Sequence, residues 1–257
     1  MMKYKPILFN TEMVQAILDG RKTQTRRIVR LPDGIDPTRA EPSPDYEETL
    51  DVWDFMHGTN ANGIFIDCFC PVKSPCAVGD ILWVRETWTK EMRNYYYRAD
   101  FESDWLDPCE TLSGGYPASC VYHPGCEGCD RQMHRIYWHP SIHMPKEAAR
   151  IFLKVTDVHP ERLQDIDEDD VCREGAEGLI LACEHMDYSF TPPEPCFNAN
   201  PCHDCIINYG YPELFGKMVW NETIKPADLQ RFGWDANPWV WVIEFERIDI
   251  PMGWCAK

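Results

Sequence analysis

Residues 20–29 read GRKTQTRRIV, and this stretch places four cations, at positions 21, 22, 26 and 27, within seven residues. Gly20 suits the position just after a helix, and residues 13–18 before it offer the apolar face that such a helix needs. The pair Ile28-Val29 then suits a strand. We interpret the stretch as a turn that leads from a helix into a strand, with a concentration of positive charge that suits an anionic ligand.

The rest of the chain is acidic. Its 257 residues include 25 Lys and Arg against 42 Asp and Glu, which gives a net charge of −17. This sign argues against a protein that coats nucleic acid through bulk electrostatics, although it is compatible with a small basic pocket. No run of 18 apolar residues and no secretory signal are visible in the sequence, so we expect a cytoplasmic protein without a membrane partner.

Blocks with the periodicity of strands and helices alternate with proline-rich stretches. The blocks expected to form the core lie at about 3–30, 78–99, 136–180 and 211–250. The stretches expected to be irregular insertions lie at about 31–77, 100–135 and 183–210. Several short strands with two or three helices predict one α+β domain over residues 1–257, with a small β-barrel, flanking helices and long cysteine-rich insertions.

Individual elements can be placed within these blocks. The pattern predicts a short acidic helix that Asp165 or Asp167 caps and that runs to about Glu174. It also predicts strands over 81–88, 149–158 and 238–247 and a helix over 213–223.

Further motifs accompany the basic turn in a fixed order. They are VGDILWVRE at 78–86, HPSIHMP at 139–145 and NPWVWVIEF at 237–245. Together with the GRKT turn they resemble the ASCH family, and in particular the large ASCH-domain proteins of tailed phages and prophages. The resemblance covers about half of the chain in scattered blocks and implies a PUA-like β-barrel. For a phage protein, the cytoplasm would be that of the host.

The resemblance also implies roles for single residues. Some small bacterial ASCH proteins are amidohydrolases that act on acetylated cytidine. Alignment of the turns puts Lys22 at the proton-acceptor position and Thr25 at the nucleophile position, and alignment of the segment before the acidic helix puts Glu174 at the proton-donor position. The chemistry is consistent, because a threonine hydroxyl needs a base, and a lysine can be that base once burial or nearby cations lower its pKa.

The remaining polar residues of the motifs are candidates for ligand binding. Arg21, Arg26, Arg27 and Glu86 would line a basic pocket that binds a nucleotide, a modified nucleoside or RNA. One alternative is an amidohydrolase or a ribonuclease that uses Lys22, Thr25 and Glu174. Another is a phage accessory protein whose acidic surface meets a host or virion protein. Whether the chain is an enzyme stays open at this point.

Thirteen cysteines form a recurring pattern. Cys120-x5-Cys126-x2-Cys129 is repeated as Cys196-x5-Cys202-x2-Cys205, in two different insertions. Two CxxC pairs can supply the four thiolates of a closed tetrahedral site, so we expect structural zinc that staples two loops. The principal ligands would be Cys126, Cys129, Cys202 and Cys205, with Cys120 and Cys196 as further candidates.

More than one ion is compatible with the cysteine count. The residues available for a second site are Cys68, Cys70, Cys76, Cys109, His123 and His203. Unconnected free cysteines are the alternative, and a redox role is disfavoured because the sequence around Cys126 does not resemble a helix N-terminus.

Overall fold

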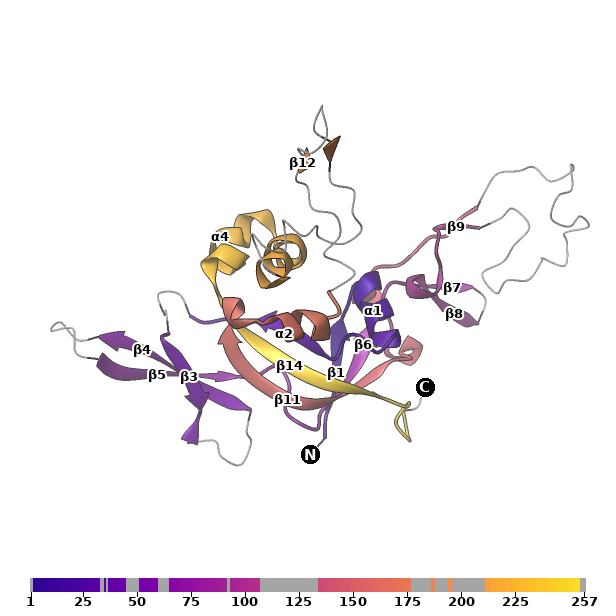
Figure 1. Ribbon diagram of the computed structural model, residues 1–257. Coiled ribbons are helices and arrows are strands. Elements are labelled where there is room, and N and C mark those ends of the chain that lie inside the picture. Colours follow the sequence, from indigo (N-terminus) through magenta and orange to yellow (C-terminus); the bar gives the residue numbers. More distant parts are fainter. Residues whose placement is uncertain are drawn as a thin grey trace, which may run out of the picture. The chain divides into compact units, whose positions relative to one another are not determined.

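The fold was analysed in a computed structural model of the chain (Figure 1). It describes residues 2–32, 35, 37–44, 51–59, 65–91, 93–106, 134–176, 186–187, 194–195 and 211–254. These residues form a mixed α+β structure with several sheets and short helices, as predicted. In this part of the chain, no helix has both the length and the apolar character needed to cross a membrane.

The largest sheet has five strands in the order β1-β6-β11-β14-β2. Its strands are β1 (Tyr4–Leu8), β6 (Ile81–Arg85), β11 (Phe152–Arg162), β14 (Trp239–Ile248) and β2 (Gln24–Ile28). Each of the four predicted core blocks contributes at least one of them. The sheet is open, with β1 and β2 at its edges, and none of the sheets in the described ranges closes into a barrel. The prediction of a small β-barrel is therefore wrong for this part of the chain.

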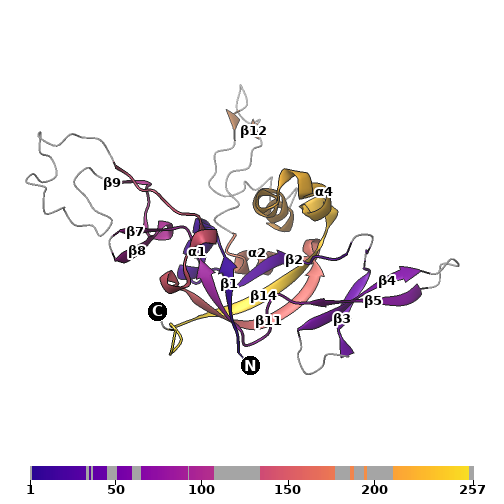
Figure 2. The same cartoon turned by 180° about the vertical axis from the view of Figure 1, so that it is seen from behind.

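The long strands β11 and β14 lie side by side in both views (Figures 1 and 2). β14 also pairs antiparallel with β2, with Ile243 opposite Thr25 and Val242 opposite Arg26. Of the ten residues of β14, Val240 to Ile243 and Phe245 are buried, which explains why this segment carries the strongest strand pattern of the sequence. The basic turn therefore leads into a strand, as the motif predicts. This strand, β2, lies at the edge of the sheet and is held by its pairing with β14.

The insertion at 31–77 is not irregular, and that prediction is wrong. It contains a three-stranded antiparallel sheet of β3 (Arg39–Pro42), β4 (Val52–Thr59) and β5 (Phe65–Lys73). The prolines that argued against regular structure, Pro42 and Pro71, lie in the two outer strands. An outer strand tolerates proline because one side of its backbone needs no partner in the sheet.

The central strand of this small sheet carries an aromatic anchor. Phe55 has no exposed surface, and its ring lies edge-on to Trp239 and Trp241 of β14, at centroid distances of 5.4 and 6.0 Å. Edge-to-face pairs at these distances are favourable beyond the area that they bury.

The described residues also form three separate two-stranded antiparallel sheets. They are β7 (Trp88–Glu91) with β8 (Asn94–Tyr97), β9 (Trp105–Leu106) with β10 (His134–Arg135), and β12 (Met186–Asp187) with β13 (Glu194–Pro195). His139 forms a bridge to Trp88, and the centroids of the two rings lie 5.0 Å apart, so this histidine packs against an aromatic residue.

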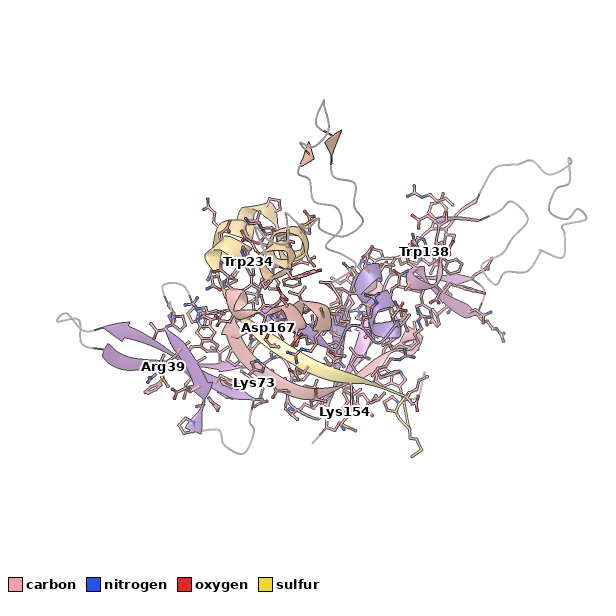
Figure 3. The ribbon with its side chains drawn as sticks, viewed as in Figure 1. Arg39, Lys73, Trp138, Lys154, Asp167 and Trp234 are labelled. Carbon is pink, nitrogen blue, oxygen red and sulfur yellow. The ribbon has the colours of Figure 1, made fainter. Side chains whose placement is uncertain are left out.

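The helices are short. They are α1 (Thr11–Leu18), α2 (Glu168–Arg173), α4 (Leu229–Phe232) and a π-helix over Phe215–Trp220. Turns of 3-10 helix cover Arg98–Asp100, Ser141–His143, Lys146–Ala148, Leu163–Asp165, Asn221–Thr223, Pro226–Asp228 and Trp234–Ala236. The predicted helix over 213–223 is thus an α-helical turn at 211–214, a π-helix over Phe215–Trp220 and a 3-10 turn over Asn221–Thr223. The ring of Trp234 (Figure 3) occupies the space that a side chain at Gly216 would need.

α2 confirms the predicted acidic helix. Asp167 (Figure 3) caps its N-terminus by accepting from the backbone N–H of Asp170 at 2.7 Å, and the carboxylate of Asp170 completes a capping box. Val171 is the buried residue of this helix, and it belongs to the same apolar cluster as Leu163, Phe215 and Val240. The cap and this apolar contact fix the direction in which the acidic residues of α2 face.

The chain groups into two compact units. The first comprises Met1–Lys5, Ala16–Leu82 and Leu153–Ile248. The second comprises Pro6–Gln15, Trp83–Phe152 and Asp249–Lys257. Lys22, Thr25 and Glu174 belong to the first unit, and Glu86 belongs to the second.

Candidate functional site

The basic turn is fixed by backbone hydrogen bonds on both sides. The N–H groups of Arg21 and Lys22 both donate to the carbonyl of Ala16 in α1, at 2.9 and 3.0 Å. Thr23 then donates to the carbonyl of Arg173 at 2.8 Å and accepts from the N–H of Phe245 at 2.9 Å. The turn is therefore held between the C-terminal end of α2 and strand β14.

Lys22 and Glu174 form a buried ion pair. The ammonium Nζ lies 2.7 Å from Oε2 of Glu174 and also donates to its backbone carbonyl at 2.9 Å. The exposed fractions of the two side chains are 0% and 4%. Burial lowers the pKa of Lys22, and Arg27 and Arg26 act in the same direction, while Glu174 opposes them. The structure thus brings together two of the three residues that the ASCH resemblance selects.

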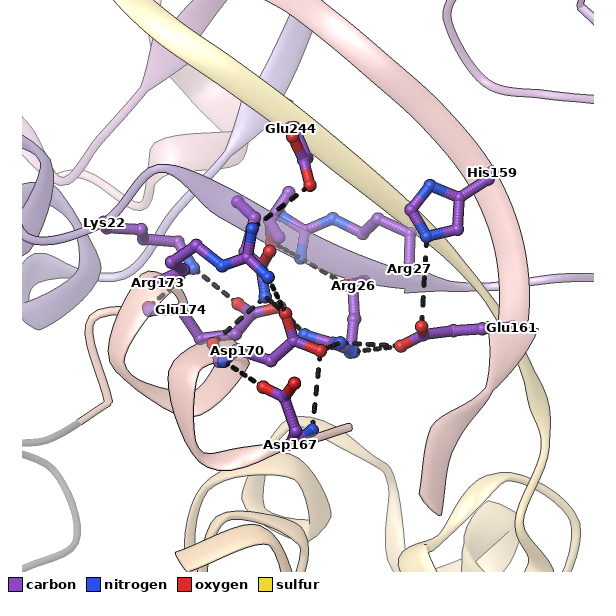
Figure 4. A network of polar contacts seen from close by, with 12 residues as sticks. Lys22, Arg26, Arg27, His159, Glu161, Asp167, Asp170, Arg173, Glu174 and Glu244 are labelled. Carbon is purple, nitrogen blue, oxygen red and sulfur yellow. Dashed lines mark hydrogen bonds and ion pairs between the residues drawn. The ribbon is translucent and has the colours of Figure 1, made fainter. Parts of the chain in front are cut away.

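Arg26 lies at the centre of a network of carboxylates (Figure 4). Its guanidinium contacts Glu161 at 2.6 Å, Asp170 at 2.8 Å and Glu174 at 3.2 Å. Burial alone would lower the pKa of Arg26, but the three carboxylates outweigh burial and raise it. Arg26 is therefore a clamp for acidic groups of its own chain.

The acids of this network respond differently to their surroundings. Burial raises the pKa of Glu161, and Arg26 offsets only part of that effect. Burial would also raise the pKa of Asp170, but Arg26, Gln24 and the backbone N–H of Asp167 outweigh burial, so the pKa of Asp170 is lowered. Asp170 therefore stays ionised more readily than Glu161 does.

The network reaches the half-exposed ring of His159 on β11. Its Nε2 lies 3.9 Å from Oε2 of Glu161 (Figure 4). Its Nδ1 lies 2.6 Å from Oδ2 of Asp157. On the other side, Arg173 pairs with Asp170 and with Glu244 of β14. The polar cluster thus connects β2, α2, β11 and β14.

Thr25, the third residue that the resemblance selects, is buried on β2. Its hydroxyl oxygen accepts from Nη1 of Arg27 at 3.1 Å, and the same nitrogen donates to the carbonyl of Arg26 at 3.1 Å. Burial lowers the pKa of Arg27, and Glu174 opposes that shift. A cation, Arg27, therefore lies directly beside the predicted nucleophile, and the hydroxyl of Thr25 bonds to this cation and not to the pair of Lys22 and Glu174.

Arg21 lies at the exposed border of the turn. It pairs with Asp19 at 2.9 Å and donates to the carbonyl of Gly175 at 3.5 Å. Gly175 itself has a positive φ of 69°, and a Cβ at this position would lie 2.7 Å from Cβ of Ala16 and 2.9 Å from Cβ of Lys22. Only glycine lets the chain turn so close to the lysine.

Glu86 belongs to a separate cluster in the second unit. Arg150 binds both of its carboxylate oxygens at 2.9 Å, contacts Asp100 at 2.7 Å and lies 3.9 Å from the ring centroid of Tyr97. Burial raises the pKa of Glu86, and Arg150 acts against that shift. This two-point contact is typical of a structural clamp.

Sequence reasoning missed Gln24, Glu161 and Asp170. Gln24 donates through Nε2 to the carbonyl of Asp170 at 3.0 Å and to its Oδ1 at 3.1 Å. The sequence feature that could have identified Gln24 is its place two residues before Arg26, at the entry to the predicted strand. Every second residue of a strand faces the same side of the sheet, so Gln24 and Arg26 can contact the same partner.

The predicted zinc ligands lie outside the described residues, and these are Cys126, Cys129, Cys202, Cys205, Cys120 and Cys196. Cys70, Cys76 and Cys172 are described, and none of the three is in a disulfide. Burial raises the pKa of Cys76 to about 12, so this thiol stays protonated at neutral pH. The described residues contain no cluster of three or more possible metal ligands.

A pocket of about 430 Å³ lies elsewhere in the first unit. It includes none of the predicted site residues and is lined by Val29, Leu31, Pro32, Ile35, Pro37, Arg162, Gln230, Arg231, Phe232, Ala236, Pro238 and Trp239. Trp239 and Arg162 both donate to the carbonyl of Pro37, at 3.1 and 2.7 Å, so part of its wall is held by hydrogen bonds.

Comparison with known proteins identifies no relative. No family model matches the chain, and neither the curated proteins nor the solved structures contain a significant match. The resemblance to ASCH proteins therefore rests on the sequence motifs alone.

Proposed function

We propose that this chain binds a modified nucleoside beside Lys22, Thr25 and Glu174. The observation that carries the proposal is the buried ion pair of Lys22 and Glu174, with its Nζ–Oε2 distance of 2.7 Å. A lysine and a glutamate that lie 152 residues apart in the sequence are brought together at the positions that the ASCH resemblance selects. Buried ionisable groups with shifted pKa values are concentrated at functional sites.

The charges around Lys22 favour a neutral ligand over a polyanion. Lys22, Arg26 and Arg27 supply three positive charges, while Glu161, Asp170 and Glu174 supply three negative ones. A phosphate would meet carboxylates as well as cations here. The net charge of −17 acts in the same direction. A nucleoside therefore fits this cluster better than a nucleotide or RNA does.

The size of the ligand is also restricted. The Lys22 side chain has no exposed surface, so a ligand reaches its ammonium only when part of the surrounding chain moves. A small flat molecule requires the least movement.

Hydrolysis of an amide is the second candidate function, and the lowered pKa of Lys22 favours it. Burial promotes the neutral amine, which is the form that accepts a proton from the hydroxyl of Thr25. The hydroxyl oxygen of Thr25 would attack the amide carbonyl, and the C–N bond would break as Glu174, which is hydrogen-bonded to Lys22, relays to the departing amine the proton that Lys22 took from Thr25. Water would then cleave the acetyl ester on Thr25 and release acetate. These are the roles that the resemblance implies for the three residues.

The experiment uses N4-acetylcytidine as the probe and compares wild type, Thr25→Val and Thr23→Val. Valine keeps the shape of threonine but removes the hydroxyl. Thr25 is buried beside Arg27, whereas Thr23 is exposed two residues earlier and serves as the control. We expect N4-acetylcytidine to raise the melting temperature of wild type and of Thr23→Val, and to do so less in Thr25→Val.

Release of acetate distinguishes the two functions. Turnover by wild type that is lost in Thr25→Val supports the hydrolase. A thermal shift without acetate supports binding alone. If N4-acetylcytidine has no effect on any of the three proteins, the proposal is wrong; RNA binding or specific capture of a host or virion protein would then support the alternatives from the sequence.

Two structural proposals accompany the functional one. We infer from the ordered motifs that the chain belongs to the ASCH family and its PUA-like fold. We also propose one or two structural zinc ions, bound mainly by Cys126, Cys129, Cys202 and Cys205.

A further inference from the structure

Gln24 is the first residue of β2 and lies in the centre of the basic motif. It is buried, with an exposed fraction of 1%. Its Nε2 donates to two oxygens of Asp170, the carbonyl at 3.0 Å and Oδ1 at 3.1 Å. Because both partners are acceptors, the nitrogen of the amide must face Asp170, and the orientation of the side chain is fixed.

The carbonyl oxygen of this side-chain amide, Oε1, has no such hydrogen bond within the described part of the chain. Oε1 of Gln24 is buried, and no donor among the described residues lies within hydrogen-bond distance of it. Folded proteins rarely leave a buried carbonyl oxygen without a donor, because the oxygen has lost its hydrogen bonds to water. Oε1 of Gln24 can therefore accept a hydrogen bond from a bound molecule.

Gln24 belongs to the same cluster as the proposed site. Asp170 accepts a hydrogen bond from Gln24 and forms an ion pair with Arg26. Arg26 also forms an ion pair with Glu174, which is the partner of Lys22. A ligand in this cluster meets a donor in Lys22 and an acceptor in Gln24. A secondary amide presents the matching pair, since its carbonyl accepts and its N–H donates.

We propose that Oε1 of Gln24 accepts a hydrogen bond from the amide N–H of the ligand and thereby selects secondary over tertiary amides. Gln24 is then a residue that determines specificity. This inference rests on the proposed function and names the chemical feature that the site recognises.

The experiment measures the affinity for two probes, N4-acetylcytidine and its N4-methyl derivative, which lacks the N–H. Wild type is compared with Gln24→Met, which keeps the length of the side chain but removes the carbonyl oxygen. Gln164→Met is the control, because the Nε2 of Gln164 also donates to a backbone carbonyl, that of Trp234 at 2.8 Å, while the residue is exposed.

We expect wild type and Gln164→Met to bind N4-acetylcytidine about tenfold or more tightly than the N-methyl probe, which is the usual effect of leaving a buried acceptor unpaired. In Gln24→Met the two affinities should become equal. A purely steric effect of the methyl group would persist in that variant.

Two results would overturn the inference while the proposed function stands. One is equal affinity of wild type for both probes, which needs no variant and so stays informative if Gln24→Met does not fold. The other is an unchanged preference in Gln24→Met. If wild type binds neither probe, the proposed function fails and this inference fails with it.

Discussion

Lys22 and Glu174 have lost nearly all contact with water, so each buried charge is stabilised by the other. Lys22 and Glu174 are 0% and 4% exposed, whereas Lys154 and Glu246, which also form an ion pair, are 50% and 55% exposed. Solvent screens the exposed pair, so it contributes little to stability. In the buried pair, the loss of one partner leaves the other charge buried with less compensation.

At the scale of residues we therefore predict different costs for two similar substitutions. Lys22→Met should lower the free energy of unfolding by about 3 kcal/mol, because Glu174 stays buried and loses its 2.7 Å ion pair while it keeps the longer contact of 3.2 Å with Arg26. Lys154→Met should lower it by less than about 1 kcal/mol. Urea unfolding measures both values.

The double variant Lys22→Met/Glu174→Gln provides the control for this prediction. Removal of both charges should recover part of the loss, because no unpaired carboxylate remains. Equal costs for Lys22→Met and Lys154→Met would contradict the view that the buried pair is a special feature of the site.

Sequence and structure agree to different degrees on single residues of the site. Lys22, Thr25 and Glu174 could be selected because short motifs identify them. Glu161 and Asp170 could not, because their contacts with Arg26 join residues that are 135 and 144 positions apart. A partner at that separation depends on the arrangement of the strands, which no local pattern reveals.

At the scale of elements, the close approach of α2 to the basic turn depends on Gly175. Its positive φ of 69° disfavours other residues, and an added Cβ would press on Ala16 and Lys22. Gly20 has a similar φ of 77°, but a Cβ there would meet nothing within 4 Å. The two glycines thus separate the effect of backbone strain from the effect of crowding.

We predict that Gly175→Ala destabilises the protein more than Gly20→Ala does. Gly20→Ala should cost about 1 kcal/mol through backbone strain alone. Gly175→Ala should cost at least about 1 kcal/mol more, because the methyl group collides with its neighbours. Urea unfolding of both variants tests this, and equal costs would show that α2 and the turn are not closely packed.

The predicted elements also show where local patterns are sufficient. The acidic helix was predictable because its cap and its apolar residue lie within a few positions of each other, and α2 confirms it. The local sequence does not predict the strands β3, β4 and β5, because Pro42 and Pro71 interrupt the strand pattern. Their tolerance depends on lying in outer strands, which is a property of the sheet and not of the local sequence.

The π-helix over Phe215–Trp220 shows a similar limit. The sequence correctly predicts helical structure here. The wider turn accompanies the packing of the Trp234 ring against Gly216, a contact that the local periodicity does not contain.

At the scale of the whole molecule, the cysteine pattern predicts that the protein binds zinc. Purified protein should contain at least one zinc per chain, and Cys126→Ser should reduce that content and lower the melting temperature, because binding of a structural zinc contributes to folding. Cys172→Ser is the control, since Cys172 is exposed and belongs to neither CxxC motif. Elemental analysis of protein prepared without chelator checks the prediction, and the absence of zinc would refute it.

The most direct test of the proposed site follows the side chain of Lys22 itself. Protein labelled with 13C at the ε-carbon of lysine gives one NMR signal for each side chain, and Lys22→Arg identifies the signal of Lys22. Addition of N4-acetylcytidine should shift this signal until it saturates, while the signal of exposed Lys154 stays in place. A Lys22 signal that does not move in a large excess of the nucleoside would contradict the assignment of the ligand site to Lys22 and Glu174.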